Sequence, residues 1–169
     1  EKNRDVHKAI ASWEKIEVMK PGYRDVREKL RQYSEFRTDD SVKDFLIMNT
    51  LQFETAARKI IENMGFQILQ MWMAGEMAVR AVATETDVKS RNRGQKTLFH
   101  IQRDMAALPE KLVREFHEGM REKACLRGIL MTTGDIMPAA ITYAATRPIE
   151  IFDSSGIVPH IRQAMAAIG

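Results

Sequence analysis

The chain has 169 residues, of which 44 % are hydrophobic and 29 % are charged, enough for one domain with a substantial core. Its formal net charge of +3 is too small to imply nucleic-acid binding by itself. The single cysteine, Cys125, excludes an internal disulfide framework and favours a reducing compartment, which we expect to be the cytoplasm. No apolar run approaches the ~20 residues of a membrane span and no signal peptide is visible, so we expect no membrane contact from this segment.

The first 48 residues are charge-rich and helical in pattern, and we assign them to an extension that precedes a main domain at 49–169. A Pro-Gly pair at 21–22 separates two amphipathic helices. The stretch 9–26 resembles the helix junction of a tetratricopeptide repeat, although a stable array needs ~3 units and about one is present. An ordinary helical hairpin explains the same pattern, so both interpretations stay open. Because the chain starts with Glu1 rather than Met, we expect a longer parent protein, with further repeats if the repeat interpretation is correct.

The first part of the main domain alternates between helical and strand periodicity. After a capping signal at 38–41 and a short helix, a longer helix is expected over 51–64, which Gly65 ends. Its buried face is expected to consist of Phe53, Ala56, Ala57, Ile60, Ile61 and Met64. The strands that follow are expected at 66–73, 78–84 and 97–103. The first of these strands reads as fully buried because both of its faces carry apolar side chains.

A polar hairpin over 86–96, with Gly94 near its tip, is expected between the second and third strands. It carries four positive charges within eight residues, namely Lys89, Arg91, Arg93 and Lys96. Such a loop can contact a nucleic-acid backbone without reading its sequence. A solvated hairpin tip explains the same composition, and no aromatic residue interleaves with the basic ones to stack on bases.

The last part of the chain contains an amphipathic helix over 108–123 and then a strand-helix-strand unit at 128–153. Gly134 and Asp135 are expected to cap the helix of that unit, and Pro148 to stop it. This helix has a face of small side chains, made of Ala139, Ala140, Ala144 and Ala145. With a closing helix over 156–168, the order α-β-β-β-α-β-α-β-α predicts an α/β sandwich around a mixed sheet.

Several short motifs between 51 and 161 resemble those of Mrr-type restriction endonucleases. Phe53-Glu54 matches the "FE" of the family's first helix, and the stretch 64–66 matches its "lGy". The unit at 128–153 is similar to the family's closing segment, which reads "vTTsgft.eA...A....i.LiDg". The resemblance implies a restriction endonuclease-like α/β/α sandwich with a central mixed sheet, preceded here by the N-terminal helical extension.

The resemblance also indicates where a nuclease active site would lie, and other residue types stand there. The family's "gDgGiDiia" has its metal-binding aspartate where this chain has Arg80. In the following "lvQvKr", His100 stands for the Gln or Glu and Gln102 for the Lys. Metal-assisted phosphodiester hydrolysis needs anionic oxygen ligands, whereas Arg80 brings a fixed positive charge and Gln102 brings none. The resemblance therefore implies a nuclease scaffold without its metal site.

Carboxylates that could rebuild such a site are Glu54, Glu76 and Asp104, of which Glu54 matches a family position and could face the old site. Solvated surface or capping roles explain the same residues. We expect no cofactor, and Mg²⁺ only if the site has been rebuilt. Arg103, next to Gln102, is turned to the other face of its strand by the period of two.

Three functions remain open. The first is a catalytically inactive nuclease-fold domain that binds the phosphate backbone of DNA or another nucleic acid without cleaving it. The candidate contacts for this function are Lys89, Arg91, Arg93, Lys96, Arg80 and Arg103. The second is a protein-interaction or sensory module of a repeat-containing protein, with partners on the N-terminal helices. The third is a metal-dependent DNA endonuclease with a rearranged active site.

Overall fold

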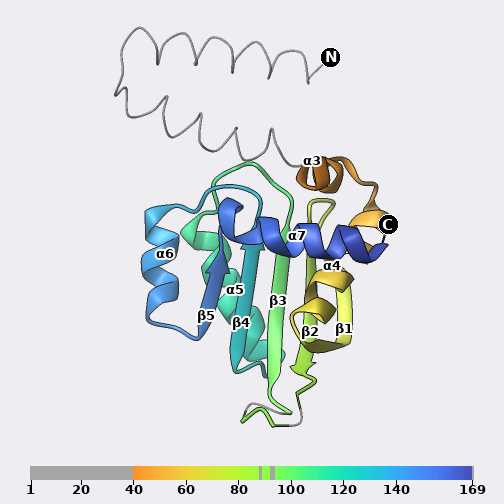
Figure 1. Cartoon of the computed structure of the whole chain (residues 1–169). Helices are drawn as coiled ribbons and strands as arrows, with labels where there is room; N and C mark the ends of the chain where they lie inside the picture. The colour runs from red at the N-terminus through yellow and green to blue at the C-terminus, as the bar shows by residue number, and fades with distance from the viewer. Residues whose placement is uncertain (1–39, 88, 92–93, 169) are drawn as a thin grey trace, which may run out of the picture. The chain divides into compact units, whose positions relative to one another are not determined.

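Residues 40–87, 89–91 and 94–168 are described by the computed structural model of the chain (Figure 1). The tetratricopeptide-like stretch at 9–26 and Arg93 of the basic hairpin lie outside these residues. The chain divides into two units between Lys43 and Asp44, and the second unit, 44–169, contains the β-sheet. The domain boundary at 48–49 remains a prediction.

The described part of the chain contains helices and strands in the predicted order, after a short helix α3 (Asp40–Ile47). They are α4 (Thr50–Asn63), β1 (Phe66–Met73), β2 (Ala78–Glu85), β3 (Lys96–Gln102), α5 (Glu110–Glu122), β4 (Arg127–Thr132), α6 (Pro138–Ala145), β5 (Ile149–Phe152) and α7 (Ser154–Ile168). The sheet order is β1-β2-β3-β4-β5, antiparallel from β1 to β3 and parallel from β3 to β5. The predicted mixed sheet is therefore confirmed. None of the described helices is long and apolar enough to cross a bilayer.

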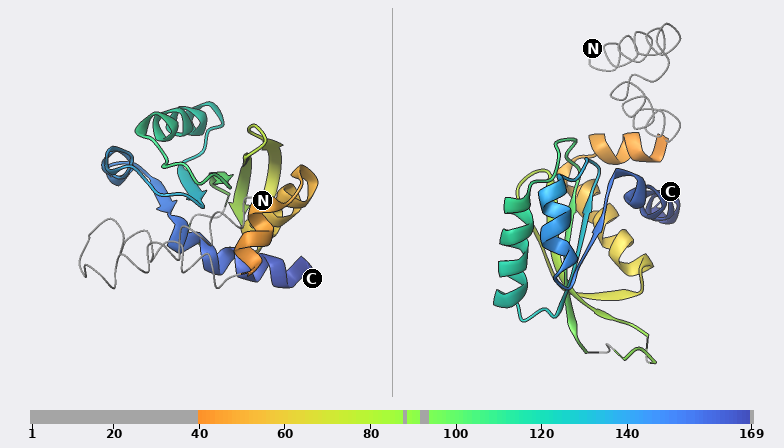
Figure 2. Two further views of the ribbon diagram at one scale, coloured as in Figure 1. Left: turned by 90° about the horizontal axis from the view of Figure 1, so that it is seen from above. Right: turned by 90° about the vertical axis from the view of Figure 1, so that its left-hand side faces the viewer.

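The helices form a layer on each side of this sheet (Figure 2). Helices α5 and α6 pack together on one side, which we call the α5 face, and α4 and α7 pack together on the other, the α4 face. The core on the α5 face consists of Val82, Leu98, Leu130, Val113, Phe116, Met120, Cys125, Leu108, Ala140 and Ala144. Cys125 is thus buried among apolar side chains, as expected for a small hydrophobe. On the α4 face, Phe99 lies edge-on to Phe66 with 5.0 Å between ring centroids.

Strand β1 differs from the prediction, because it is an edge strand and not a buried one. Leu69 is 53 % exposed, and the pairing register with β2 shifts between Ile68 and Gln70. Such a bulge leaves a residue unpaired and turns its side chain away from the neighbouring strand. The apolar side chains on both faces of β1 are therefore only partly covered by the rest of the domain. Met64, which was expected on the buried face of the preceding helix, is only half-buried.

The turn before α6 also differs from the prediction. Helix α6 begins at Pro138 without a side-chain cap, so Gly134 and Asp135 do not cap it. The Asp135 carbonyl instead accepts a hydrogen bond from the Leu108 amide at 2.8 Å. Gly134 is needed for close packing, since a Cβ atom there would lie 2.5 Å from the Ala106 carbonyl oxygen.

The small-residue face of α6 is narrower than predicted. Ala140 and Ala144 are buried, whereas Ala139 and Ala145 are exposed. Residues four apart share a helix face, and only one such pair points to the sheet. The helix ends at Ala145, three residues before the expected stop at Pro148.

Candidate functional site

The structure brings together Arg80, His100 and Gln102, the three residues that the motif comparison predicts at the family's catalytic positions. Arg80 on β2 lies opposite His100 on β3, and Gln102 follows two residues later on the same strand face. The Arg80 Nε atom donates a hydrogen bond to His100 Nδ1 at 3.1 Å. On the other side of the ring, His100 Nε2 lies 3.0 Å from Gln102 Oε1. The three side chains form a continuous hydrogen-bonded chain on the α5 face.

The tautomer and charge of His100 follow from these two contacts. Because Nδ1 accepts from a guanidinium that cannot lose its proton, the imidazole proton is on Nε2 and is donated to Gln102. His100 is 3 % exposed, and burial lowers its pKa to about 4, with a further lowering from the charge of Arg80 and an opposing effect of the Gln102 hydrogen bond. His100 is therefore neutral near pH 7, and both of its ring nitrogens are engaged.

This set of donors does not fit a magnesium ion. Mg²⁺ prefers carboxylate and water oxygens in octahedral geometry. The chain of Arg80, His100 and Gln102 offers one amide oxygen, which already accepts a hydrogen bond, beside a fixed positive charge. Within the described ranges, no group of three or more His, Cys, Asp or Glu side chains is placed to hold a metal ion.

The carboxylates that could have rebuilt the site lie elsewhere. The Glu54 side chain, on α4, lies 3.9 Å from the Arg58 guanidinium. Helix α4 is on the opposite side of the sheet from α5, whose Phe116 lies under the Arg80 guanidinium (Figure 2). Glu54 therefore does not face Arg80, His100 and Gln102, although its match to a family position left that open. Glu76 is exposed in the turn between β1 and β2, and Asp104 accepts a hydrogen bond from the Ala106 amide at 2.9 Å. Glu76 is thus a surface residue, and Asp104 stabilises the loop that follows β3.

Arg103 is buried on the α4 face, which removes it from the candidate nucleic-acid contacts. It is 6 % exposed and its guanidinium lies 4.4 Å from the centroid of the Phe53 ring. One of its nitrogens donates to the carbonyl oxygens of Phe45, at 3.4 Å, and Met48. The alternation along β3 explains this position, because it turns Arg103 away from Gln102. Burial lowers the pKa of Arg103.

A pocket of about 320 Å³ opens beside Arg80, at the edge of the α5 face. We call this hollow the Arg80 pocket. Its lining residues come from β1, β2, β3 and the end of α5, and they are Gln70, Trp72, Arg80, Leu98, Gly119, Glu122 and Lys123. The Lys123 ammonium lies 5.0 Å from the Trp72 ring centroid and 3.5 Å from Gln70 Oε1. Sequence reasoning missed Gln70, Trp72 and Lys123. A glutamine every third position in an otherwise apolar strand, at 67 and 70, was the available signal that β1 is not buried.

The charges in the Arg80 pocket favour an anion. Among the described residues, no carboxylate lies within ion-pairing distance of Arg80 or Lys123. Burial lowers the pKa of Arg80, and the charge of Glu115 opposes this effect. Glu122 also lines the pocket, which leaves two cations against one carboxylate. Guanidinium and ammonium groups in this arrangement suit a phosphate.

The basic hairpin continues from this pocket. Lys89, Arg91 and Lys96 are exposed, and no carboxylate of the described residues forms an ion pair with them. Burial raises the pKa of the Cys125 thiol, and the charges of Lys96 and Lys123 lower it by a smaller amount. Lys96 shares a strand face with Leu98 of the Arg80 pocket, and Lys89 and Arg91 precede it in the hairpin.

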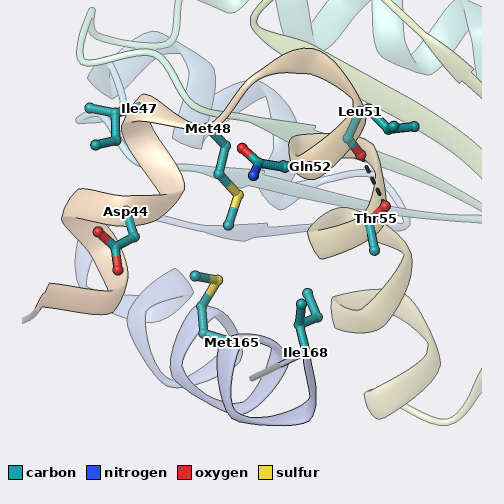
Figure 3. A pocket seen from close by; sticks show the side chains of 8 residues that line it. All are labelled: Asp44, Ile47, Met48, Leu51, Gln52, Thr55, Met165 and Ile168. Carbon is teal, nitrogen blue, oxygen red and sulfur yellow. Dashed lines mark hydrogen bonds between the residues drawn. The ribbon is translucent and has the colours of Figure 1, made fainter.

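A second hollow, of about 550 Å³, lies between α3, α4 and α7 (Figure 3). It is an apolar groove lined by Asp44, Ile47, Met48, Leu51, Gln52, Thr55, Met165 and Ile168. Ile47 and Leu51 are 81 % and 73 % exposed. The groove contains no cationic side chain among its lining residues, so its chemistry differs from that of the Arg80 pocket.

Comparison with known proteins agrees with this fold. The Mrr catalytic-domain model, described as restriction endonuclease, matches residues 45–161, which is more than half of the chain. The chain therefore belongs to the Mrr-type restriction endonuclease family, and the resemblance inferred from its motifs is confirmed. No curated protein matches the sequence.

Two solved structures are similar to the chain. The DNA modification-dependent restriction endonuclease AspBHI is 14 % identical with a TM-score of 0.50, over 76 % of this chain and 37 % of that one. The MspJI restriction endonuclease in complex with a 27-mer oligonucleotide is 12 % identical with a TM-score of 0.42, over 87 % of this chain and 33 % of that one. The likeness to AspBHI supports the fold. The chain spans 37 % of the length of AspBHI and 33 % of the length of MspJI.

Proposed function

We propose that this domain binds the phosphate backbone of nucleic acid without cleaving it. The observation that carries the proposal is the Arg80 pocket, where Arg80 and Lys123 converge without an ion-pair partner among the described residues. The family supports DNA as the partner, since AspBHI is by its name a DNA modification-dependent restriction endonuclease. The domain would keep the family's affinity for DNA in a different set of contacts.

The expected contacts run along the α5 face. A phosphate at Arg80 and Lys123 would be followed by backbone contacts at Lys96, Lys89 and Arg91. These side chains neutralise phosphates and release counterions, which gives affinity without base recognition. Arg93 belongs to the same hairpin in the sequence and remains a predicted contact.

The absence of cleavage follows from the same chemistry. At the family's catalytic positions the chain has a guanidinium, a neutral imidazole and an amide, all hydrogen-bonded to one another. None of them supplies the anionic oxygen that holds a hard cation beside a scissile phosphate. Catalytic groups that act as a unit lose nearly all of their effect when the unit is removed.

The test is the salt dependence of binding to a fluorescently labelled DNA duplex, followed by anisotropy between about 50 and 200 mM salt. The double substitution Lys89→Gln/Arg91→Gln should weaken binding and reduce the slope of log K against log salt by about 2, one for each lost phosphate contact. The matched control, Arg58→Gln/Lys59→Gln, removes the same charge from α4 on the opposite side of the sheet. No binding by the wild type at low salt, or an equal loss in the control, would contradict the proposal.

One observation favours the alternative function, a protein-interaction module. The apolar groove between α3, α4 and α7 exposes Ile47 and Leu51, which suits a protein partner and not a phosphate (Figure 3). The groove lies on the α4 side, so the two functions respond to different substitutions. Leu51→Ser should leave DNA affinity unchanged. The alternative would be favoured if the protein had no DNA affinity and if Leu51→Ser changed its assembly state on size-exclusion chromatography.

A further inference from the structure

We infer that the Arg80 pocket binds a single nucleoside phosphate, with the phosphate at Arg80 and Lys123 and the base against Trp72. The inference rests on the proposed function and specifies its ligand. A volume of about 320 Å³ is at the lower end of the ~300–1,000 Å³ of small-molecule sites, which suits one nucleotide and not a stacked run.

The phosphate end of the pocket is already oriented. Arg80 is held by its Nε hydrogen bond to His100, and His100 is held in turn by Gln102. The guanidinium fork therefore has one direction before any ligand arrives, which reduces the entropy lost on binding. Gly119 of α5 lies beside the guanidinium, since the site of its absent Cβ is 3.5 Å from Arg80 Nη1. Lys123 adds a second cation from the end of α5.

The base end of the pocket combines an aromatic ring with polar edges. Trp72 is half-buried on the edge strand β1, and its indole is covered by the Lys123 ammonium at 5.0 Å. Stacking of a base on an aromatic side chain contributes roughly 1–3 kcal/mol and tolerates every base. Gln70 offers an amide and Glu122 a carboxylate for hydrogen bonds to the edge of a base. When a phosphate binds Lys123, the ammonium leaves the Trp72 ring, and the ring becomes free to stack on the base.

A base inside a duplex is paired and stacked on its neighbours, so it cannot enter this pocket. The ligand is therefore an unpaired or terminal nucleotide of a nucleic acid, or a free nucleotide. Both sources share the same chemistry, a phosphate next to an accessible base. The two sources differ in whether Lys89 and Arg91 of the hairpin contribute to the affinity, because only a nucleic-acid strand is long enough to reach both the Arg80 pocket and the hairpin.

The experiment measures quenching of Trp72 fluorescence. The chain has two tryptophans, and a Trp13→Phe background leaves Trp72 as the only reporter. The probes are AMP, adenosine, inorganic phosphate, a 5′-phosphorylated single-stranded oligonucleotide and a blunt duplex. We expect strong, saturable quenching by AMP and by the single strand and none by adenosine. Inorganic phosphate and the blunt duplex should give only a small change, because they bring a phosphate to Lys123 without a base against Trp72. Lys123→Gln should weaken the binding of AMP and of the single strand by about tenfold, whereas Lys111→Gln, an exposed lysine near the start of α5, should change neither.

The outcomes separate this inference from the proposed function. Duplex binding through the hairpin without any quenching by AMP or single strand would overturn the inference and leave the proposed function intact. Quenching by AMP without affinity for any oligonucleotide would support a free-nucleotide site and contradict the proposed function. Equal quenching by adenosine and AMP, or equal losses in Lys123→Gln and Lys111→Gln, would overturn the assignment of the phosphate.

Discussion

Arg80 and His100 lie directly opposite each other on β2 and β3, and a 3.1 Å hydrogen bond joins Arg80 Nε to His100 Nδ1. A histidine accepts such a bond only when it is neutral. The burial of His100 and the nearby guanidinium both act in this direction, since each lowers the pKa of the ring. Strand pairing thus determines the protonation state of one residue and the orientation of the other.

This relationship predicts that stability falls in mild acid. Folding lowers the pKa of His100 from 6.5 to about 4, so the unfolded chain takes up the proton first as the pH falls. The stability that comes from neutral His100 is complete above pH 6.5 and is lost as the pH falls towards 4. Over this window the free energy of unfolding should decrease by about 3 kcal/mol more in the wild type than in His100→Gln.

Urea unfolding at several pH values between about 7 and 4 measures this difference. The quantity compared is the slope of the unfolding free energy against pH, so a constant effect of the substitution at neutral pH cancels. The contribution of the other histidines cancels too, because both proteins contain them. Parallel curves for the wild type and His100→Gln would show that His100 is already accessible to protons in the folded state.

The order of helices and strands from α4 to α7 was predictable because each element has its own apolar period and its own ending. Gly65, with φ +88°, ends the first long helix, and Gly94, with φ +85°, lies in the β2–β3 hairpin, as the sequence indicated. The burial of β1 was not predictable in the same way. Apolar residues on both faces indicate a central strand, but the position of a strand in the sheet depends on contacts between distant segments.

The candidate site was predictable in part. The motif alignment placed Arg80, His100 and Gln102 at the family positions, and the alternation along β2 and β3 puts them on one face. Which helix covers that face depends on the handedness of the β3-α5-β4 crossover, so the separation from Glu54 could not be read from spacing. Trp72 and Lys123 reach the Arg80 pocket from other elements, and no sequence motif connects them.

The position of Glu54 suggests an alignment shifted by one residue on β3. Ile101 and Arg103 would then stand for the catalytic Gln or Glu and the Lys, on the α4 face that Glu54 shares. The residue opposite Ile101 on β2 is Val79, which is also apolar. Neither register therefore puts a carboxylate at the metal-binding position.

Packing between α5 and β4 predicts opposite effects for two glycines. A Cβ atom at Gly128 would lie 2.5 Å from Phe116 Cε1 and 2.7 Å from Met120 Sδ, so Gly128→Ala should destabilise the domain by about 1–3 kcal/mol. At Gly119 the nearest atoms are at 3.5 Å, and Gly119→Ala should stabilise α5 by about 0.5–1 kcal/mol. Urea unfolding followed by circular dichroism measures both. Equal stabilities would show that α5 shifts to accommodate the methyl group.

The burial of Arg103 predicts a structural and not a binding phenotype. Arg103→Met keeps an unbranched side chain against Phe53 but leaves the Phe45 and Met48 carbonyls without their donor at the end of α3. Loss of these hydrogen bonds should cost about 1–3 kcal/mol of unfolding free energy. The affinity of the folded protein for DNA should equal that of the wild type. A folded Arg103→Met variant with reduced DNA affinity would return Arg103 to the nucleic-acid interface.

The chemistry of the site finally predicts that divalent metal ions support neither cleavage nor stabilisation. A supercoiled plasmid incubated with the protein and Mg²⁺ or Mn²⁺ should remain intact, because Arg80, His100 and Gln102 bond to one another and, among the described residues, no group of three or more His, Cys, Asp or Glu side chains is placed to hold a metal ion. The temperature of unfolding should be the same with these ions as with a chelator, since an ion that does not bind the folded state cannot stabilise it. Cleavage that disappears in Glu54→Ala, with Glu62→Ala on the same helix as the matched control, would instead establish a rearranged active site on the α4 face. That result would assign the family's chemistry to the face of the sheet opposite the Arg80 pocket.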